Sequence, residues 1–344
     1  MKITKKRDIG PLPVAIVLFA MMIAAAVLNL AWAPLHHLSL SDVWNVIIGK
    51  GTWANTFIVI NFNLPRVIIG IIVGAGLAVS GAVMQALFRN PMASPYILGL
   101  SSGAALGAAV GMIFVVSFIP MLILSPLLAF VSCFLTMMLV YSLSRVGGNT
   151  HTETLLLAGI AVGAFISALV SFLTYIAGEK MAGIVFWSMG SLSGVSVNEI
   201  MFILPFVAVG ILIMIMLSKE LNVMMLGDAH AMDLGVNVKN VRFVLLICTT
   251  MVTAASVAFV GVIGFVGLVI PHIIRLLVGP DNRKVIPLSV IGGAAYLIMC
   301  DYIAHSFGNY IGVGTIPIGI ITAMIGGPYF IYLLRRRKSQ IGWN

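Results

Sequence analysis

The amino-acid sequence predicts an all-α integral membrane protein with about ten transmembrane helices, and three observations support this. Of its 344 residues, 61% are hydrophobic and only 8% are charged, whereas soluble domains carry roughly 25% charged residues. The apolar residues form long runs instead of the strict alternation typical of a transmembrane barrel. The 19 Lys and Arg residues gather between these runs. The composition excludes a disordered chain, a secreted disulfide scaffold and a cytosolic enzyme.

Ten apolar segments are long enough to cross a membrane. A helix needs about 20 apolar residues to span roughly 30 Å of hydrocarbon. Glycine and proline interrupt the third, eighth and ninth segments. The predicted spans are residues 12–32, 65–87, 95–116, 120–143, 153–176, 199–218, 241–261, 264–279, 285–306 and 315–334.

The basic residues set the orientation of these spans. An even number of spans places both termini on the same side, and each terminal segment carries four Lys or Arg residues. With the termini in the cytoplasm, sixteen of the 19 basic residues are cytoplasmic, which is a strong positive-inside signal. The excess of positive charge therefore reflects topology and not binding to nucleic acid. The three basic residues on the outer side are Lys50, Arg66 and Lys180.

We expect a single transmembrane domain over residues 1–344. Residues 1–11 would form a cytoplasmic tail, residues 219–240 a cytoplasmic loop between the sixth and seventh spans, and residues 335–344 a second tail. A multi-pass protein of this kind resides in the cell membrane, in contact with lipid.

Glycine recurs at four-residue spacing in several spans. Lipid supplies no hydrophobic drive for helix association, so membrane helices pack where small residues allow close approach of their backbones. The pattern predicts packing faces, or a bundle whose helices slide against each other. The repeated positions are Gly70 and Gly74; Gly103, Gly107 and Gly111; and Gly159 and Gly163.

Catalytic and metal-binding motifs are not found in the sequence. The segment 49–52, Gly-Lys-Gly-Thr, lacks the glycine and the directly following Ser or Thr that a phosphate loop requires. No Cys-x-x-Cys pair occurs, and no His/Glu cluster has the spacing of metal ligands. We expect neither a cofactor nor a metal site.

Polar side chains inside the spans are the first candidates for function. Asp301 and His305 are four residues apart and therefore share a helix face, and Gln85 lies near the inner end of the second span. The Asp301/His305 pair fits an interhelical clamp, a proton relay or the lining of a substrate path.

Several ordered blocks of sequence resemble the permeases of the iron-siderophore and vitamin B12 importer family, the FecCD/BtuC type. The clearest are Arg-Asn-Pro-Met-Ala-Ser-Pro at 89–95 and the block at 264–275. The others are residues 64–66, 74–85, 98–99, 103–104, 187–192, 316–323 and 325–330. The resemblance implies the permease fold of type II ABC importers, which has ten helices and agrees with the topology above.

The resemblance also implies partners. Such a permease forms a homodimer, binds two cytoplasmic ABC ATPase subunits that hydrolyse ATP, and receives substrate from an extracytoplasmic binding protein. The permease itself is then not an enzyme. The segment 226–236 resembles the ATPase-coupling loop, whose expected coupling residues are Leu226, Gly227, Asp228, Ala231, Leu234 and Gly235. Ala231 and Leu234 are three apart, which predicts a shared face for the ATPase groove.

Other residues take roles from the same resemblance. Arg66, Lys180 and His305 are expected to dock the binding protein, although Asn63 and His305 stand where many members carry arginine. The residues expected to line the translocation path or to serve helix packing are Gln85, Asn90, Pro91, Gly99, Trp187, Gly190, Pro271 and Asp301.

Three functional hypotheses follow from the sequence. The first is the permease of an ABC importer for an iron chelate, haem or cobalamin. The second, an ion- or proton-coupled secondary transporter, is favoured by Asp301 and the helix breaks. The third, a membrane-embedded enzyme, lacks any nucleophile–base pair or metal constellation.

Overall fold

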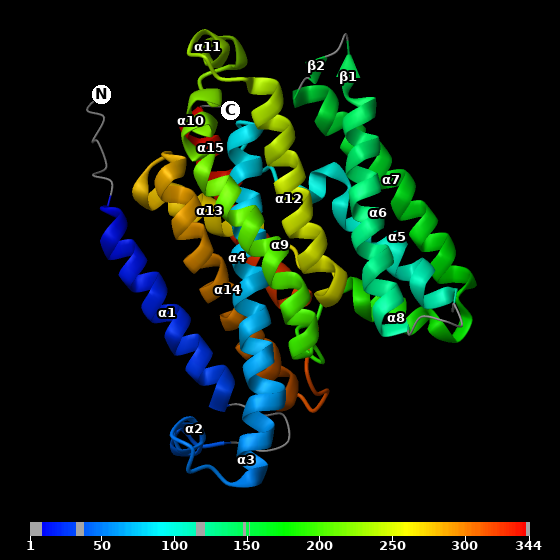
Figure 1. Cartoon of the computed structure of the whole chain (residues 1–344), viewed down its shortest axis with the longest axis vertical. Coiled ribbons are helices and arrows are strands. Elements are labelled where there is room, and N and C mark those ends of the chain that lie inside the picture. The colour runs from blue at the N-terminus through cyan, green and yellow to red at the C-terminus, as the bar shows by residue number, and fades with distance from the viewer. Residues whose placement is uncertain (1–8, 32–37, 115–120, 147–148, 151, 342–344) are drawn as a thin grey trace.

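The computed structural model describes residues 9–31, 38–114, 121–146, 149–150 and 152–341. It is a bundle of long helices with one short hairpin (Figure 1). In chain order the elements are α1 Pro11–Ala31, α2 Leu40–Ile47, α3 Trp53–Ile58, η1 Val59–Asn63, α4 Leu64–Leu87, η2 Pro95–Leu98, α5 Leu100–Ile113, α6 Met121–Leu143, β1 Arg145–Val146, β2 Asn149–Thr150, α7 Thr152–Ile176, η3 Gly178–Lys180, α8 Met181–Ser188, α9 Val197–Met216, α10 Ser218–Met224, α11 Asp228–Asp233, α12 Val238–Val260, α13 Val266–Val278, α14 Asn282–Tyr310 and α15 Ile318–Ile341.

The ten predicted spans correspond to helices of the structure. Among the described residues, seven helices are long and apolar enough to cross a membrane, and α5, α13 and α15 contribute three shorter apolar segments. The helix α5 is short because the chain first makes a 3-10 turn at η2 and then passes through Gly99. The φ of Gly99 is 75°, a left-handed value that glycine adopts readily because it has no side chain. The predicted membrane fold is therefore confirmed.

The two ends of the bundle differ in their elements. The helices α10 and α11, the β1–β2 hairpin and the C-terminal end of the chain lie at one end, whereas α2, α3 and α8 lie at the other (Figure 1). The first end carries Arg89, Arg145 and Arg242, and the second carries Lys50 and Lys180. The positive-inside rule makes the first end cytoplasmic. Most of the predicted N-terminal tail, residues 1–8, lies outside the described residues.

The second span is longer than its apolar run indicates. Helix α4 continues the π turn η1 and α3 without a break, so one helix of 35 residues runs from Trp53 to Leu87. At 1.5 Å per residue it is about 52 Å long, well beyond roughly 30 Å of hydrocarbon. Its first turns extend past the end of α1 and pack with α2 around a small cluster of Leu38, Val43 and Val59.

The helix α4 lies in the centre of the bundle and is buried along nearly its whole length. It contacts α14 most extensively, and α13, α12 and α9 pack around it. Helices α5, α6 and α7 form a neighbouring group (Figure 1). The core of the protein therefore surrounds α4.

The glycine repeats lie at close helix contacts, which confirms their predicted packing role. A Cβ on Gly74 would collide with the backbone of Gly293 in α14, and a Cβ on Gly107 would collide with the backbone of α6. Gly159 and Gly163 of α7 lie against the 97–99 turn. These contacts bring backbones together at a distance that no larger residue allows.

A proline explains one of the closest contacts. Pro271 lies inside α13 and has no N–H, so the carbonyl of Gly267 four residues earlier receives no helical hydrogen bond from it. That carbonyl points at Gly81 of α4, where any side chain would overlap it. The carbonyl that Pro271 leaves without a helical donor thus lies at a close contact of α13 with Gly81 of α4.

Candidate functional site

A buried ion pair joins α4 to α14 near the outer end of the bundle. Nε of Arg66 donates to Oδ2 of Asp301 and Nη2 donates to Oδ1, each at 2.7 Å. The Asp301 side chain is 2% exposed and that of Arg66 is 13% exposed. This is the bidentate geometry in which arginine binds a carboxylate most strongly.

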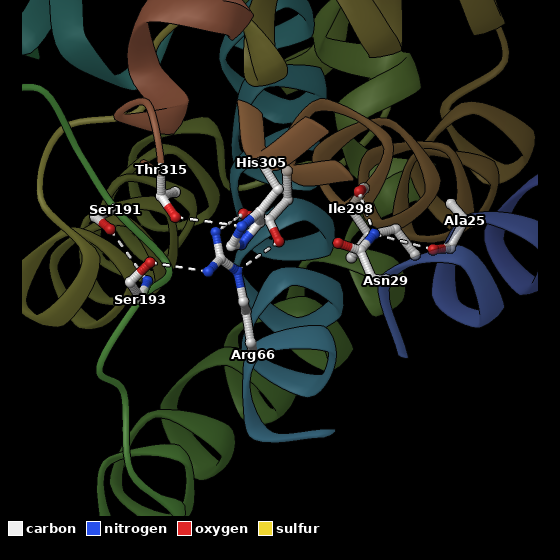
Figure 2. A network of polar contacts seen from close by, with 9 residues as sticks. Ala25, Asn29, Arg66, Ser191, Ser193, Ile298, His305 and Thr315 are labelled. Carbon is white, nitrogen blue, oxygen red and sulfur yellow. Dashed lines mark hydrogen bonds and ion pairs between the residues drawn. The ribbon is translucent and has the colours of Figure 1, made fainter. Parts of the chain in front are cut away.

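Neighbouring loops complete this polar network, as Figure 2 shows. Nη1 of Arg66 donates to Oγ of Ser193 at 2.9 Å, in the segment between α8 and α9. The ring Nδ1 of His305 lies 3.2 Å from Oγ1 of Thr315, in the segment between α14 and α15. The ion pair therefore links two helices, and two of the loops at this end, α8–α9 and α14–α15, lie beside it.

A second polar contact holds α1 against α14. Nδ2 of Asn29 donates to the carbonyl of Ile298 at 2.8 Å and to that of Ala25 at 2.9 Å (Figure 2). Asn63 of the neighbouring π turn donates to the carbonyl of Leu30 at 2.9 Å. Asn63 therefore serves the packing of α1.

The three residues predicted to dock the binding protein differ in how far they are exposed. His305 is 3% exposed, so its ring does not reach the outer surface, and the expectation that it contacts a docking protein is wrong for this structure. Arg66 is mostly buried and forms an ion pair with Asp301. Asp301 needs this cation, because burying its carboxylate without one would cost several kcal/mol. Lys180 donates from Nζ to the carbonyl of Ile113 at 3.0 Å. Lys50 is exposed in the turn after α2.

The residues predicted for the path or for packing fall into two groups. Gly99, Gly190 and Trp187 lie at contacts between helices: Gly190 has a φ of 72° and accepts a hydrogen bond from the N–H of Ile318 at 3.0 Å. The backbone of Trp187 lies against Gly261. Gly190 and Trp187 thus lie where the end of α8 meets the start of α15 and the turn after α12, whereas Gly99 lies against Gly159 and Gly163 of α7.

The second group forms the turn after α4 at the cytoplasmic end. Oδ1 of Asn90 accepts from the N–H of Met92 at 2.9 Å, and Pro91 lies between them, which is an Asx turn. Arg89, just before it, has a φ of 49°, a left-handed value that is uncommon outside glycine. Gln85 is buried at 2% exposure and donates to the carbonyl of Leu268 at 3.0 Å.

The segment predicted to couple to an ATPase, residues 226–236, contains the short helix α11 and follows directly after the short helix α10. Gly227 has a φ of 122° and lets the chain turn from α10 into α11. Asp228 at the start of α11 accepts from Arg242 at 2.6 Å and from Arg89 at 3.2 Å. One carboxylate thus fixes α11 to both α12 and the turn after α4.

The expected shared face of Ala231 and Leu234 is wrong. Ala231 is 0% exposed and packs into the main core, whereas Leu234 is 65% exposed. A three-residue spacing places side chains about 60° apart around a helix, so one can point inward and the other outward. Within this segment, the exposed large apolar side chains among the described residues are Leu226, Met232 and Leu234.

Some features of the site were not predicted from the sequence. The bridging role of Asp228 was missed, although the predicted cytoplasmic placement of Arg89 and Arg242 offered a signal for it. The partner of Asp301 was also missed, because Arg66 is 235 residues away in the chain. Among the described residues, no group of three His, Cys, Asp or Glu side chains is placed to hold a metal ion.

The sequence profile of the FecCD transport family matches residues 17–336 of this chain. The chain belongs to the FecCD transport family. It is 42% identical to the cobalamin import system permease BtuC of Halobacterium salinarum over 91% of this chain and 80% of that protein. It is 37% identical to the hemin transport system permease HmuU of Yersinia pestis over 93% of this chain and 95% of that protein.

A solved structure agrees with these relatives. The inward-facing conformation of a putative metal-chelate type ABC transporter superposes with a TM-score of 0.82 at 31% identity, covering 94% of this chain and 99% of that one. The FecCD protein described here is therefore a multi-pass membrane permease subunit of an ABC importer, located in the cell membrane.

Proposed function

We propose that this permease imports a bulky metal chelate, of the class that includes iron-siderophores, haem and cobalamin. The observation that carries the proposal is the similarity over nearly the whole chain to permeases named for cobalamin and hemin. An iron chelatin permease of Helicobacter pylori is 36% identical over 83% of this chain.

These cargoes share size and a chelated metal, and a single such bundle does not easily enclose one. We therefore infer a homodimer with the path at its interface, each copy contributing residues 1–344 as one permease domain.

ATP hydrolysis belongs to two separate ATPase subunits in this proposal, and α10–α11 is the segment that contacts them. Support comes from its position at the cytoplasmic end and from its rigid connection to the bundle through Asp228. The three exposed apolar residues Leu226, Met232 and Leu234 supply the contact surface. An exposed apolar patch of this kind is typical of a protein interface.

An extracytoplasmic binding protein delivers the chelate to the other end. Among the described basic residues at that end, Lys50 is exposed, whereas Arg66 and Lys180 have partners within the chain. We propose Lys50 as the first contact for acidic residues of the binding protein, and the Arg66 network as the element beneath the docking surface.

An ion- or proton-coupled secondary transporter is the main alternative to an ABC importer, and Asp301 favours it. The bidentate contact with Arg66 accounts for a carboxylate at this depth without proton transfer. Import of a metal chelate therefore remains the proposed function.

Calorimetry on the cognate binding protein tests the proposed cargo. Iron-siderophore, haem and cobalamin are titrated separately, with citrate and a metal-free siderophore as controls. Tight binding of one metal chelate supports the assignment. Binding of a sugar, a peptide or a bare oxyanion in preference to every chelate would contradict it.

A further inference from the structure

A cavity of about 270 Å³ opens at the cytoplasmic end between α4, the turn after it, α13 and the α10–α11 junction. Its described lining includes two arginines and one histidine and no acidic residue. The lining residues are Gln85, Arg89, Asn90, Pro91, Met225, His272, Arg275 and Leu276.

Arg275 of α13 is the least satisfied cation in this cavity wall. Its Nη2 makes only two long contacts, 3.4 Å to the carbonyl of Ala82 and 3.5 Å to Oδ1 of Asn282. Its Nε is buried and has no hydrogen-bond partner in the described part of the chain. Among the described residues, none of the four ion pairs includes Arg275. A guanidinium has five N–H groups, and a buried charge without a counterion is costly.

The positive charge of Arg89 is only partly neutralised. Its guanidinium shares the carboxylate of Asp228 with Arg242, and the shorter contact, 2.6 Å, belongs to Arg242. The left-handed backbone of Arg89 holds the side chain at the cavity mouth, where it is 41% exposed. Arg89 therefore shares its carboxylate with a second arginine and lies in the same cavity wall as Arg275.

Gln85 adds an acceptor to the same wall. Its side chain is almost completely buried and its Nε2 is bound to Leu268, but its Oε1 has no partner. A ligand that satisfies this wall must offer anionic oxygens to the arginines and a hydroxyl to Gln85. A phosphate that bears or adjoins a hydroxyl group has both, and arginine is the residue that binds phosphate with the best geometry.

We propose that this cavity binds a phosphate group with an adjacent hydroxyl. Two sources offer that chemistry at the cytoplasmic end: the head group of phosphatidylglycerol in the inner leaflet and free inorganic phosphate. Basic pockets between membrane helices on the cytoplasmic side bind anionic head groups in this way. The bound phosphate supplies the counterion for Arg275 and ties α13 to the turn after α4.

Binding measurements on the purified full-length permease in detergent test the proposal. Native mass spectrometry compares phosphatidylglycerol with phosphatidylcholine, and calorimetry titrates inorganic phosphate against chloride. We expect phosphatidylglycerol or phosphate to bind about tenfold more tightly than its control, and Arg275→Gln to remove that preference. Arg283→Gln has the same change of charge at the same end but lies outside the cavity, so it should alter affinity less than about twofold.

The two binding measurements also identify the source of the phosphate group. Preference for phosphatidylglycerol without binding of phosphate assigns the lipid, whereas binding of phosphate alone assigns the free anion. If Arg275→Gln does not fold, Arg89→Gln replaces it, with an expected loss of about threefold or more. Equal binding of anionic and neutral ligands by the wild type would overturn the proposal, as would wild-type affinity in the cavity variant that folds.

Discussion

Arg66 and Asp301 face each other with both carboxylate oxygens and two guanidinium nitrogens in contact at 2.7 Å, which ties α4 to α14 across the outer half of the bundle. The pair is almost excluded from solvent. Two consequences follow. Arg66 has a structural role within the chain, and any docking partner that approached it would have to compete with Asp301.

Replacing Asp301 with Asn should destabilise the permease by about 3 kcal/mol, because it leaves the buried Arg66 without its counter-charge. Thermal unfolding in detergent measures the loss. Glu179→Gln, an exposed carboxylate at the same end, should have almost no effect. The double variant Arg66→Met/Asp301→Leu should recover most of the stability, since it removes both charges together. Unchanged stability in Asp301→Asn would contradict the structural role of the pair.

Replacing Gly81 with Val should prevent correct folding or cost more than about 3 kcal/mol, because the side chain would overlap the backbone of Gly267. The yield of monodisperse protein after size-exclusion chromatography reports the effect. Gly183→Ala on α8 is the matched control, since nothing lies within 4 Å of the added Cβ. A well-folded Gly81→Val protein would show that α13 does not approach α4 as closely as described.

Hydropathy and charge predicted the spans and their orientation because both report on the membrane, which acts on each segment separately. The early start of the second span at Trp53 was missed, since length beyond the bilayer is set by packing against α2. The prediction that Ala231 and Leu234 share a face was wrong for a similar reason. Spacing gives the angle between two side chains, but the position of the rest of the protein decides which one is buried.

Opposite outcomes are expected for two arginine substitutions on the coupling segment. Ala231→Arg places a charge in the core and should lower thermal stability by several kcal/mol. Leu234→Arg lies on the surface, so it should keep stability within about 0.5 kcal/mol and still reduce assembly with the ATPase. Thermal unfolding and co-purification with the ATPase distinguish the two. Normal assembly of Leu234→Arg, Met232→Arg and Leu226→Arg would exclude this segment as the contact.

Charge reversal at Lys50 should weaken docking of the binding protein mainly through a slower association rate, because an exposed cation steers an acidic partner. Biolayer interferometry at low and at high salt measures the rate. We expect a loss of about threefold or more for Lys50→Glu at low salt and a smaller loss at high salt. Lys50→Arg keeps the charge and serves as the control. Equal rates for Lys50→Glu and Lys50→Arg would remove Lys50 from the docking surface.

The central claim is that this FecCD protein is the membrane path of an ATP-driven importer. The most direct test measures uptake of the cognate metal chelate into proteoliposomes that contain the permease and its ATPase, with the binding protein outside and ATP inside. We expect uptake that requires ATP, the ATPase and the binding protein, and that persists when a proton uncoupler is added. Uptake without the ATPase that collapses on addition of the uncoupler would contradict it.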